Sequence, residues 1–207
     1  MTTELEVSRR ERKKEETKER IVQAAFALFR KRGVAATTVE EICEKADVAK
    51  GTFFNYFPHK EAVFGYLSEQ WVADAEEKVG EILAKGLPAW PKVRDVFLEF
   101  ASFYEEDRDL SKHMLQEWTR CMHDPEDTTN RRWDELGVHV VRQLQAKGEL
   151  RRDVPPERVH HVLADVYHAT IMRWLESPEP PFPLKDELRK RLTLVVDGVA
   201  PPAKEGR

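Results

Sequence analysis

The sequence predicts an all-α protein of about nine helices, in which a small N-terminal head of three helices precedes a larger C-terminal helical bundle. Apolar residues recur at the i, i+3, i+4 and i+7 spacing of a helix face along most of the chain. No strand-like alternation of useful length and no internal repeat accompanies this pattern. The 207 residues suffice for one or two domains with a sizeable core, and we place the domains at 1–60 and 61–207.

The first predicted helix covers about residues 16–32. Gly33 ends it, because glycine readily adopts the left-handed conformation found after helix C-termini. Thr38 followed three positions later by Glu41 is a capping box, which places the start of the second helix at Val39.

A third, short helix is predicted at about residues 49–57, three or four residues after the second. Asp47 lies in the break between them, where its carboxylate can cap the third helix. Phe53 and Phe57 are predicted core residues that hold the two short helices at their crossing, and Cys43 is a predicted small buried hydrophobe. This is a helix-turn-helix pattern. A head of about 45 residues is too small to hold a core alone, so it must pack on the helix that follows.

Six further helices are predicted from the same periodicity. Proline is favoured at a first helical position, so the fourth helix begins near Pro58, and it continues to Gly86. The other five cover about residues 93–104, 113–124, 127–147, 156–176 and 184–199. Helix 156–176 is apolar on two sides, so it needs two partners, its own core and a second copy of the chain.

Charge is distributed unevenly along the chain. The net charge of −4 argues against nucleic-acid binding by the chain as a whole, but residues 9–60 carry +5 and residues 61–207 carry −7. Positive charge is therefore concentrated beside the helix-turn-helix. The mixed run at residues 9–20 is either a solvated helix start or an arm that follows DNA phosphates, and the sequence leaves both interpretations open.

The chain has no apolar run of the roughly 20 residues that a membrane span needs, and its N-terminus lacks the apolar region of a signal peptide. We therefore expect a cytoplasmic protein with no membrane partner. Cys43 and Cys121 do not form a disulfide framework, which favours reduced thiols.

The helix-turn-helix resembles the DNA-binding signature of the TetR family of bacterial repressors. The relevant stretch is KGTFFNYFPHKEAVF, preceded by TTVEEI and FRKRG. Eight positions match the family pattern, namely Val48, Lys50, Gly51, Thr52, Tyr56, Phe57, Lys60 and Glu61. Four positions depart from it, namely Ala49, Phe53, Phe54 and Val63.

The recognition helix at 49–57 supplies residue types suited to DNA. Lys50, Thr52 and Asn55 can reach base edges, while Gly51 removes a side chain where the backbone and DNA approach each other. The resemblance implies phosphate contacts from further positions, and Phe54 lacks the tyrosine hydroxyl that the family often places there for a phosphate. The predicted DNA-binding set is Thr38, Ala49, Lys50, Gly51, Thr52, Asn55, Tyr56, His59 and Lys60.

The resemblance, together with a surplus of large apolar residues, implies a ligand cavity in the bundle. Taken singly, each residue of this surplus is better explained by ordinary core packing, so the prediction applies only to the set. The predicted ligand-binding set is Phe97, Phe100, Tyr104, Met114, Trp118, Met122, Trp133, Tyr167, His168 and Met172.

His161, Asp165 and His168 lie at i, i+4 and i+7 of one helix and are capable metal ligands, but a polar strip that faces solvent or a second copy explains them better. No HExxH motif or cysteine pair accompanies them, so we predict no metal site and no cofactor. P-loop, GxGxxG and GxSxG motifs are also absent from the sequence, and we expect no enzymatic activity.

These features predict a transcriptional regulator, a repressor that binds near-palindromic double-stranded operator DNA as a homodimer and is released by a mainly apolar small molecule. Two alternatives belong to other classes, namely a helical enzyme or carrier without a DNA role and a helical protein-interaction adaptor. The family pairs its last two helices with those of a second copy. The predicted dimer interface is Ala164, Ile171, Leu188, Leu192, Val195 and Val196.

Overall fold

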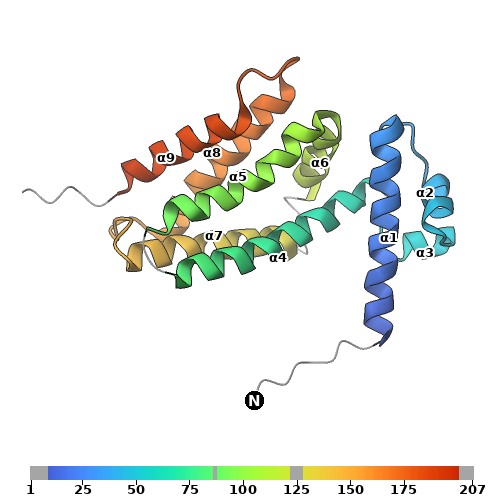
Figure 1. The fold of residues 1–207 in the computed structure, drawn as a ribbon, viewed down its shortest axis with the longest axis horizontal. Coiled ribbons are helices and arrows are strands. Elements are labelled where there is room, and N and C mark those ends of the chain that lie inside the picture. Colours follow the sequence, from blue (N-terminus) through green and yellow to red (C-terminus); the bar gives the residue numbers. More distant parts are fainter. Residues whose placement is uncertain (1–8, 86–87, 122–127, 201–207) are drawn as a thin grey trace, which may run out of the picture. The chain divides into compact units, whose positions relative to one another are not determined.

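The structure is a computed structural model that describes residues 9–85, 88–121 and 128–200. These residues form nine α-helices and one 3-10 helix, with no strand among them (Figure 1). The all-α prediction is confirmed. In chain order the helices are α1 (Arg9–Arg32), α2 (Val39–Ala46), α3 (Lys50–Phe54), the 3-10 helix η1 (Lys60–Ala62), α4 (Val63–Ala84), α5 (Trp90–Glu106), α6 (Arg108–Cys121), α7 (Thr128–Ala146), α8 (Pro156–Glu176) and α9 (Leu184–Gly198).

The chain divides into two compact units between Tyr66 and Leu67. In the first unit, the predicted capping box at α2 is present. The Glu41 amide donates to Thr38 Oγ1 at 3.3 Å, and the Thr38 amide donates to Glu41 Oε2 at 2.9 Å. Phe53 is fully buried and Phe57 nearly so, which confirms both as core residues. Cys43 is buried as well, and this burial raises the pKa of its thiol, as expected for a small apolar residue rather than a reactive one.

Helix α1 begins at Arg9, about two turns before the predicted start at residue 16. The prediction began at the first apolar residues, but arginine, lysine and glutamate are themselves good helix formers. An ion pair one turn apart, between Arg12 Nε and Glu16 Oε1 at 3.6 Å, is compatible with this extension. The mixed-charge run is therefore helical from Arg9 onward.

Asp47 ends α2 instead of capping α3, so this prediction was wrong. Its φ of 53° lies in the left-handed region, and its amide donates to the carbonyls of Cys43 and Glu44. Aspartate tolerates this conformation better than most residues, which lets it close a helix where glycine is more usual. The N-cap of α3 is Ala49, whose side chain makes no capping hydrogen bond.

Two other helix starts also differ from the prediction. Helix α4 does not begin near Pro58, because His59 is extended and a 3-10 turn precedes the helix. Helix α6 begins five residues before His113, because the Asp107 carboxylate accepts a hydrogen bond from the Leu110 amide at 3.0 Å and so caps the helix. The predicted helix at 156–176 agrees with α8 at both ends.

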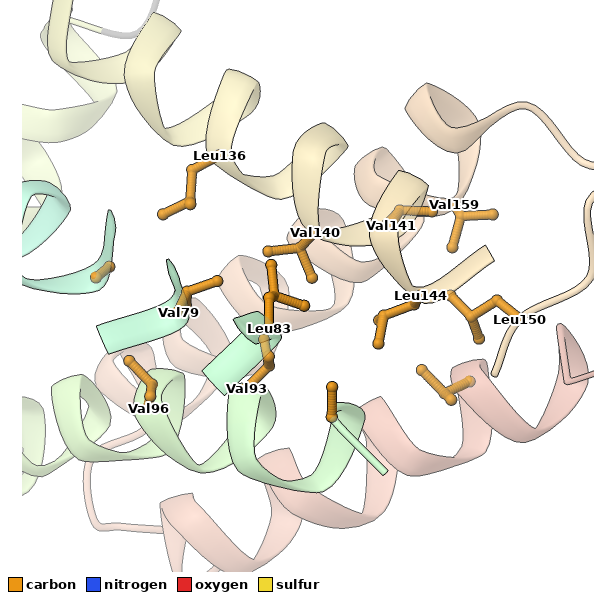
Figure 2. Close-up of a cluster of buried hydrophobic side chains, with 13 residues drawn as sticks. Val79, Leu83, Val93, Val96, Leu136, Val140, Val141, Leu144, Leu150 and Val159 are labelled. Carbon is orange, nitrogen blue, oxygen red and sulfur yellow. The ribbon is translucent and has the colours of Figure 1, made fainter. Parts of the chain in front are cut away.

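The second unit contains two clusters of buried apolar side chains. The larger one lies between α4, α5, α7, α8 and α9, and Figure 2 shows its side chains in the space between the helices. Its members include Val79, Leu83, Val93, Val96, Leu136, Val140, Val141, Leu144, Leu150, Val159 and Val196. The smaller cluster joins α5, α8 and α9 through Leu98, Ala101, Ile171, Trp174, Leu175, Leu184 and Leu188.

Four of the six residues predicted at a dimer interface are buried inside the protomer, namely Ile171, Leu188, Leu192 and Val196. These four side chains therefore have little surface left for a second copy, and the interface stays a prediction. Every fourth residue of α9 from Leu184 onward faces the protomer's own core, and a side chain without exposed surface cannot bury more against a second copy. Ala164 and Val195 are partly exposed, while Val162 and Leu194 are the large apolar side chains exposed on α8 and α9.

Candidate functional site

All nine residues predicted to bind DNA lie in the first unit, around α2, α3 and η1. Because Phe53 points into the core, the opposite side of α3 faces outward. The exposed members of the set are Thr38, Ala49, Lys50, Gly51 and Asn55. The partly exposed members are Thr52, Tyr56, His59 and Lys60. Their individual DNA contacts remain predictions.

Lys50 at the start of α3 pairs with Glu40 on α2. The hydrogen bond from the Lys50 ammonium raises the pKa of this lysine and lowers the pKa of the Glu40 carboxyl. Both side chains are more than half exposed, and such surface pairs contribute little to stability. A phosphate or a base edge can therefore take the place of Glu40 at small cost.

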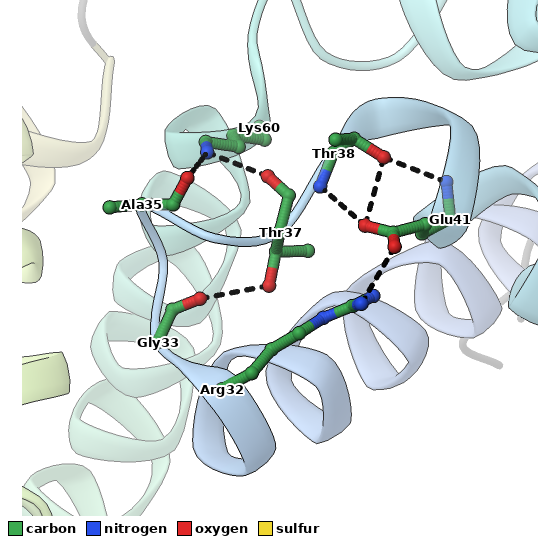
Figure 3. A network of polar contacts seen from close by, with 7 residues as sticks. All are labelled: Arg32, Gly33, Ala35, Thr37, Thr38, Glu41 and Lys60. Carbon is green, nitrogen blue, oxygen red and sulfur yellow. Dashed lines mark hydrogen bonds and ion pairs between the residues drawn. The ribbon is translucent and has the colours of Figure 1, made fainter.

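Lys60, one of the residues predicted to bind DNA, is the first residue of η1 and is bonded within the head (Figure 3). Its ammonium donates to the Val34 carbonyl at 2.6 Å, to the Thr37 carbonyl at 2.7 Å and to the Ala35 carbonyl at 3.4 Å. The side chain is only 19% exposed. Through these hydrogen bonds, Lys60 holds the loop between α1 and α2 against the start of η1. Sequence reasoning missed this role, since the partners lie 23 to 26 positions away.

Further bonds hold the same loop. The buried Thr37 hydroxyl donates to the Gly33 carbonyl at 2.9 Å, and Arg32 Nη1 lies 2.6 Å from Glu41 Oε1 (Figure 3). The Thr38 hydroxyl both accepts from the Glu41 amide and lies 2.9 Å from Glu41 Oε2. The surface around Thr38 is thus ordered before any DNA binds, which reduces the conformational entropy lost on binding.

Lys60→Met is expected to lower the free energy of unfolding of the head by about 1 to 3 kcal/mol, because three carbonyls lose a charged donor. Hydrogen exchange of the Ile42 amide, which donates to Thr38, measures this loss locally. Lys45→Met, at an exposed position of α2, is the control and should leave the exchange rate unchanged. Equal exchange in both variants would contradict a structural role for Lys60.

In the second unit, five of the residues predicted to bind a ligand belong to one cluster of rings. Phe97 and Phe100 on α5 lie 6.1 and 5.9 Å from Trp133 on α7, between ring centroids, and Phe97 lies 6.5 Å from Tyr167 on α8. Trp71 on α4 stacks on Phe100 at 5.6 Å and contacts Tyr104 at 6.3 Å. We call Trp71, Phe97, Phe100, Phe103, Tyr104, Trp133 and Tyr167 the aromatic cluster. The predicted set omitted Trp71, since it considered helices after the fourth.

The remaining predicted residues lie beside this cluster or outside it. The ring of His168 stacks on Trp118 of α6 at 4.4 Å and contacts Tyr167 at 5.7 Å. Met114 is buried and Met172 is partly buried. Met122 lies outside the described residues.

Burial favours the neutral form of two tyrosines of the aromatic cluster and of His168 beside it. Burial raises the pKa of Tyr104 and of Tyr167 and lowers the pKa of His168. The Tyr167 hydroxyl donates to the Phe97 carbonyl at 3.1 Å, and Trp118 Nε1 donates to Asn130 Oδ1 at 3.1 Å. This environment suits an apolar ligand with uncharged polar groups.

His161 and Asp165, the other two candidate metal ligands, are exposed on α8. Within residues 9–85, 88–121 and 128–200, no three His, Cys, Asp or Glu side chains are grouped so that they could hold a metal ion.

Comparison with known proteins identifies the family. The pattern described as "Bacterial regulatory proteins, tetR family" matches residues 21–67, and that of the C-terminal domain of "TetR/AcrR family transcriptional repressors" matches residues 69–198. The chain belongs to the TetR family. This TetR-family member is a DNA-binding transcriptional regulator, with α2 and α3 as its helix-turn-helix.

Related proteins match this TetR-family regulator over most of its length. One of them is FadR of Thermus thermophilus, a TetR-family transcriptional repressor solved in complex with lauroyl-CoA. FadR is 34% identical to this chain, and the match covers 91% of this chain and 100% of FadR with a TM-score of 0.70. The repressor KstR2 of Rhodococcus jostii (strain RHA1) is 25% identical over 194 residues, which are 88% of this chain and 90% of KstR2. The repressor SmeT of Stenotrophomonas maltophilia shares the fold, with a TM-score of 0.67. It is 20% identical, and the match covers 90% of this chain and 91% of SmeT.

No helix in the described part of the chain combines the length and the apolar character needed to cross a membrane.

Proposed function

We propose that this regulator is a repressor that leaves its operator when an acyl thioester of a long-chain acid binds at the aromatic cluster. The observation that carries the proposal is the cluster itself, a group of aromatic rings from α4, α5, α7 and α8, with His168 beside it held in its neutral form by burial. The identity of 34% with the lauroyl-CoA-bound FadR supports this chemical class.

An acyl thioester and the corresponding free acid need different partners at the aromatic cluster. The binding free energy of an acyl chain becomes more favourable by about 0.8 kcal/mol for each methylene that is buried among apolar side chains. A free carboxylate at the same depth would need a cationic partner, and His168 is held in its neutral form by burial. An uncharged thioester carbonyl requires only a hydrogen-bond donor, while the charged end of the ligand remains in water.

The regulator acts as a homodimer in this proposal, and the outward faces of α8 and α9 form the contact. Val162 and Leu194 are the large apolar side chains exposed there, in place of the buried residues predicted from the sequence. A two-fold dimer places its two recognition helices in successive major grooves when they are about 34 to 36 Å apart. Effector binding that changes this spacing reduces operator affinity, by about 5- to 150-fold for a coupling of about 1 to 3 kcal/mol.

Fluorescence anisotropy with a labelled duplex from the region upstream of the gene tests this proposal. Lauroyl-CoA is expected to weaken DNA binding within that range, whereas coenzyme A alone and laurate should have little effect. Trp118→Ala should reduce the response to lauroyl-CoA, because it removes the ring that stacks on His168. Trp90→Phe, an aromatic change on α5 outside the cluster, is the control and should keep the full response.

An unchanged operator affinity with every acyl compound would contradict the proposed effector. Tight binding of lauroyl-CoA without any effect on DNA would instead favour the carrier that the sequence left as an alternative.

A further inference from the structure

Phe54 is a large aromatic side chain left exposed on the recognition helix. It is 47% exposed, and the other large apolar side chains exposed to this degree within the described residues, Val162 and Leu194, belong to the second unit. Burying an apolar ring is favourable by about 25 cal/mol for each Å² removed from water. A partner that covers Phe54 therefore gains affinity from it.

The geometry of α3 places Phe54 next to the outermost part of the helix. Successive residues are about 100° apart around a helix, so Gly51 and Asn55 lie roughly opposite the buried Phe53, and Phe54 lies beside them. The Phe54 ring meets the Phe53 ring edge to face, with centroids 5.5 Å apart and planes at 86°. This contact holds the exposed ring in a defined direction.

Gly51 leaves open space beside Phe54, one turn earlier on the helix. A glycine in a helix costs about 1 kcal/mol relative to alanine. Its backbone is not among those with positive φ, and a Cβ built on it would meet no atom of the described residues within 4 Å. Nothing in the described part of the chain therefore requires glycine at this position. A flat partner can approach the backbone of α3 here and reach the Phe54 ring.

We propose that Phe54 recognises thymine, with its ring packed against the C5-methyl group of one thymine in each half of the operator. The thymine methyl is the apolar group on the base edges that the major groove exposes, while the other groups there donate or accept hydrogen bonds. A phenyl ring has no group that bonds a phosphate. The inference rests on α3 as the DNA-reading helix of the family and is independent of the effector.

The test begins with operators selected by the wild-type protein from a pool of random duplexes. Each thymine of the selected half-site is then replaced by deoxyuridine, which lacks only the methyl group, and the affinity is measured by anisotropy. At one position, the replacement should weaken binding about fourfold in one half-site and about fifteenfold in both, as expected for about 0.8 kcal/mol per buried carbon. A 5-methylcytosine at that position should bind better than cytosine.

Phe54→Ala should abolish the difference between thymine and deoxyuridine at that position, and Phe54→Leu should retain part of it. Asn55→Ala, the neighbouring control, should weaken binding but leave the ratio of thymine to deoxyuridine affinity unchanged. Circular dichroism and thermal melting check that each variant is folded, and the deoxyuridine scan of the wild-type protein needs no variant.

Three outcomes would overturn the proposal. They are equal affinity for thymine and deoxyuridine at every position, a thymine preference that persists in Phe54→Ala, and a uniform loss of affinity for all duplexes in that variant. If the thymine preference is present but lauroyl-CoA does not weaken DNA binding, only the proposed effector is contradicted.

Discussion

Leu192→Glu is expected to lower the free energy of unfolding by about 4 kcal/mol or more, because it places a carboxylate in the protomer's own core. Leu192 on α9 is 4% exposed, between the fully buried Leu188 and the buried Val196. The substitution removes the apolar contacts of leucine, which are typically worth about 2 to 5 kcal/mol. It also requires either a buried charge or a carboxyl whose pKa is raised so that it is neutral. Urea denaturation followed by circular dichroism measures the loss.

Leu194→Glu is the matched control, two residues farther along the same helix. Leu194 is 74% exposed, so the fold of the protomer should tolerate the charge within about 0.5 kcal/mol. If the outward faces of α8 and α9 pair two copies, this variant should instead shift the mass seen by light scattering toward that of one 24.1 kDa chain. A Leu192→Glu variant that is as stable as the wild type yet monomeric would show that α9 is oriented differently.

Local signals in the sequence predicted the head well. The capping box of Thr38 and Glu41 and the buried Phe53 were predicted correctly, because both depend on neighbours within a few residues. The ends of α8 were predicted for the same reason, since a proline begins the helix and its apolar spacing is regular.

The face of α9 that meets the core could not be predicted, because a stripe of apolar residues does not specify which neighbour covers it. In the structure, α5 and α8 of the same chain cover Leu188, and the larger cluster covers Val196. Pairing between two copies of the chain would account for the same apolar stripe, and the sequence-based prediction assigned it to the interface. Only the arrangement of the helices distinguishes the two, and it identifies Leu194 as the exposed side chain.

Contacts between side chains and distant backbone atoms also leave no local signal. The Glu149 carboxylate accepts the amides of Ala89 and Trp90 and so caps α5 from 60 positions away. Lys60 bonds three carbonyls of a loop more than 20 positions earlier. Residues of these types are abundant on the surface of any helical protein, so spacing alone does not distinguish the bonded ones.

Arg108 is a third side chain that bonds to distant backbone atoms without a local signal in the sequence. A cation at the first residue of a helix opposes the helix dipole, so Arg108 is unfavourable for α6 itself. Its guanidinium reaches the C-terminus of α8, where backbone carbonyls lack partners within the helix. It donates to the carbonyls of Trp174 at 2.7 Å and Pro178 at 2.8 Å, and also to those of Leu175 and Ser177. The guanidinium also lies 5.2 Å from the centroid of the Trp174 ring.

Arg108→Met is therefore expected to lower the free energy of unfolding by about 3 kcal/mol, since several carbonyls lose a charged donor and the end of α8 loses its cap. Arg108→Lys should cost less than Arg108→Met but more than zero, because an ammonium keeps the charge and loses the planar fork of donors. Urea denaturation measures the loss of stability in both variants. Arg131→Met is the control, because Arg131 is exposed and its Nε lies 3.9 Å from Oε1 of the exposed Glu135. This control substitution should lower the free energy of unfolding by less than about 1 kcal/mol. If Arg108→Met is no less stable than Arg131→Met, the bonds to the end of α8 do not contribute to stability.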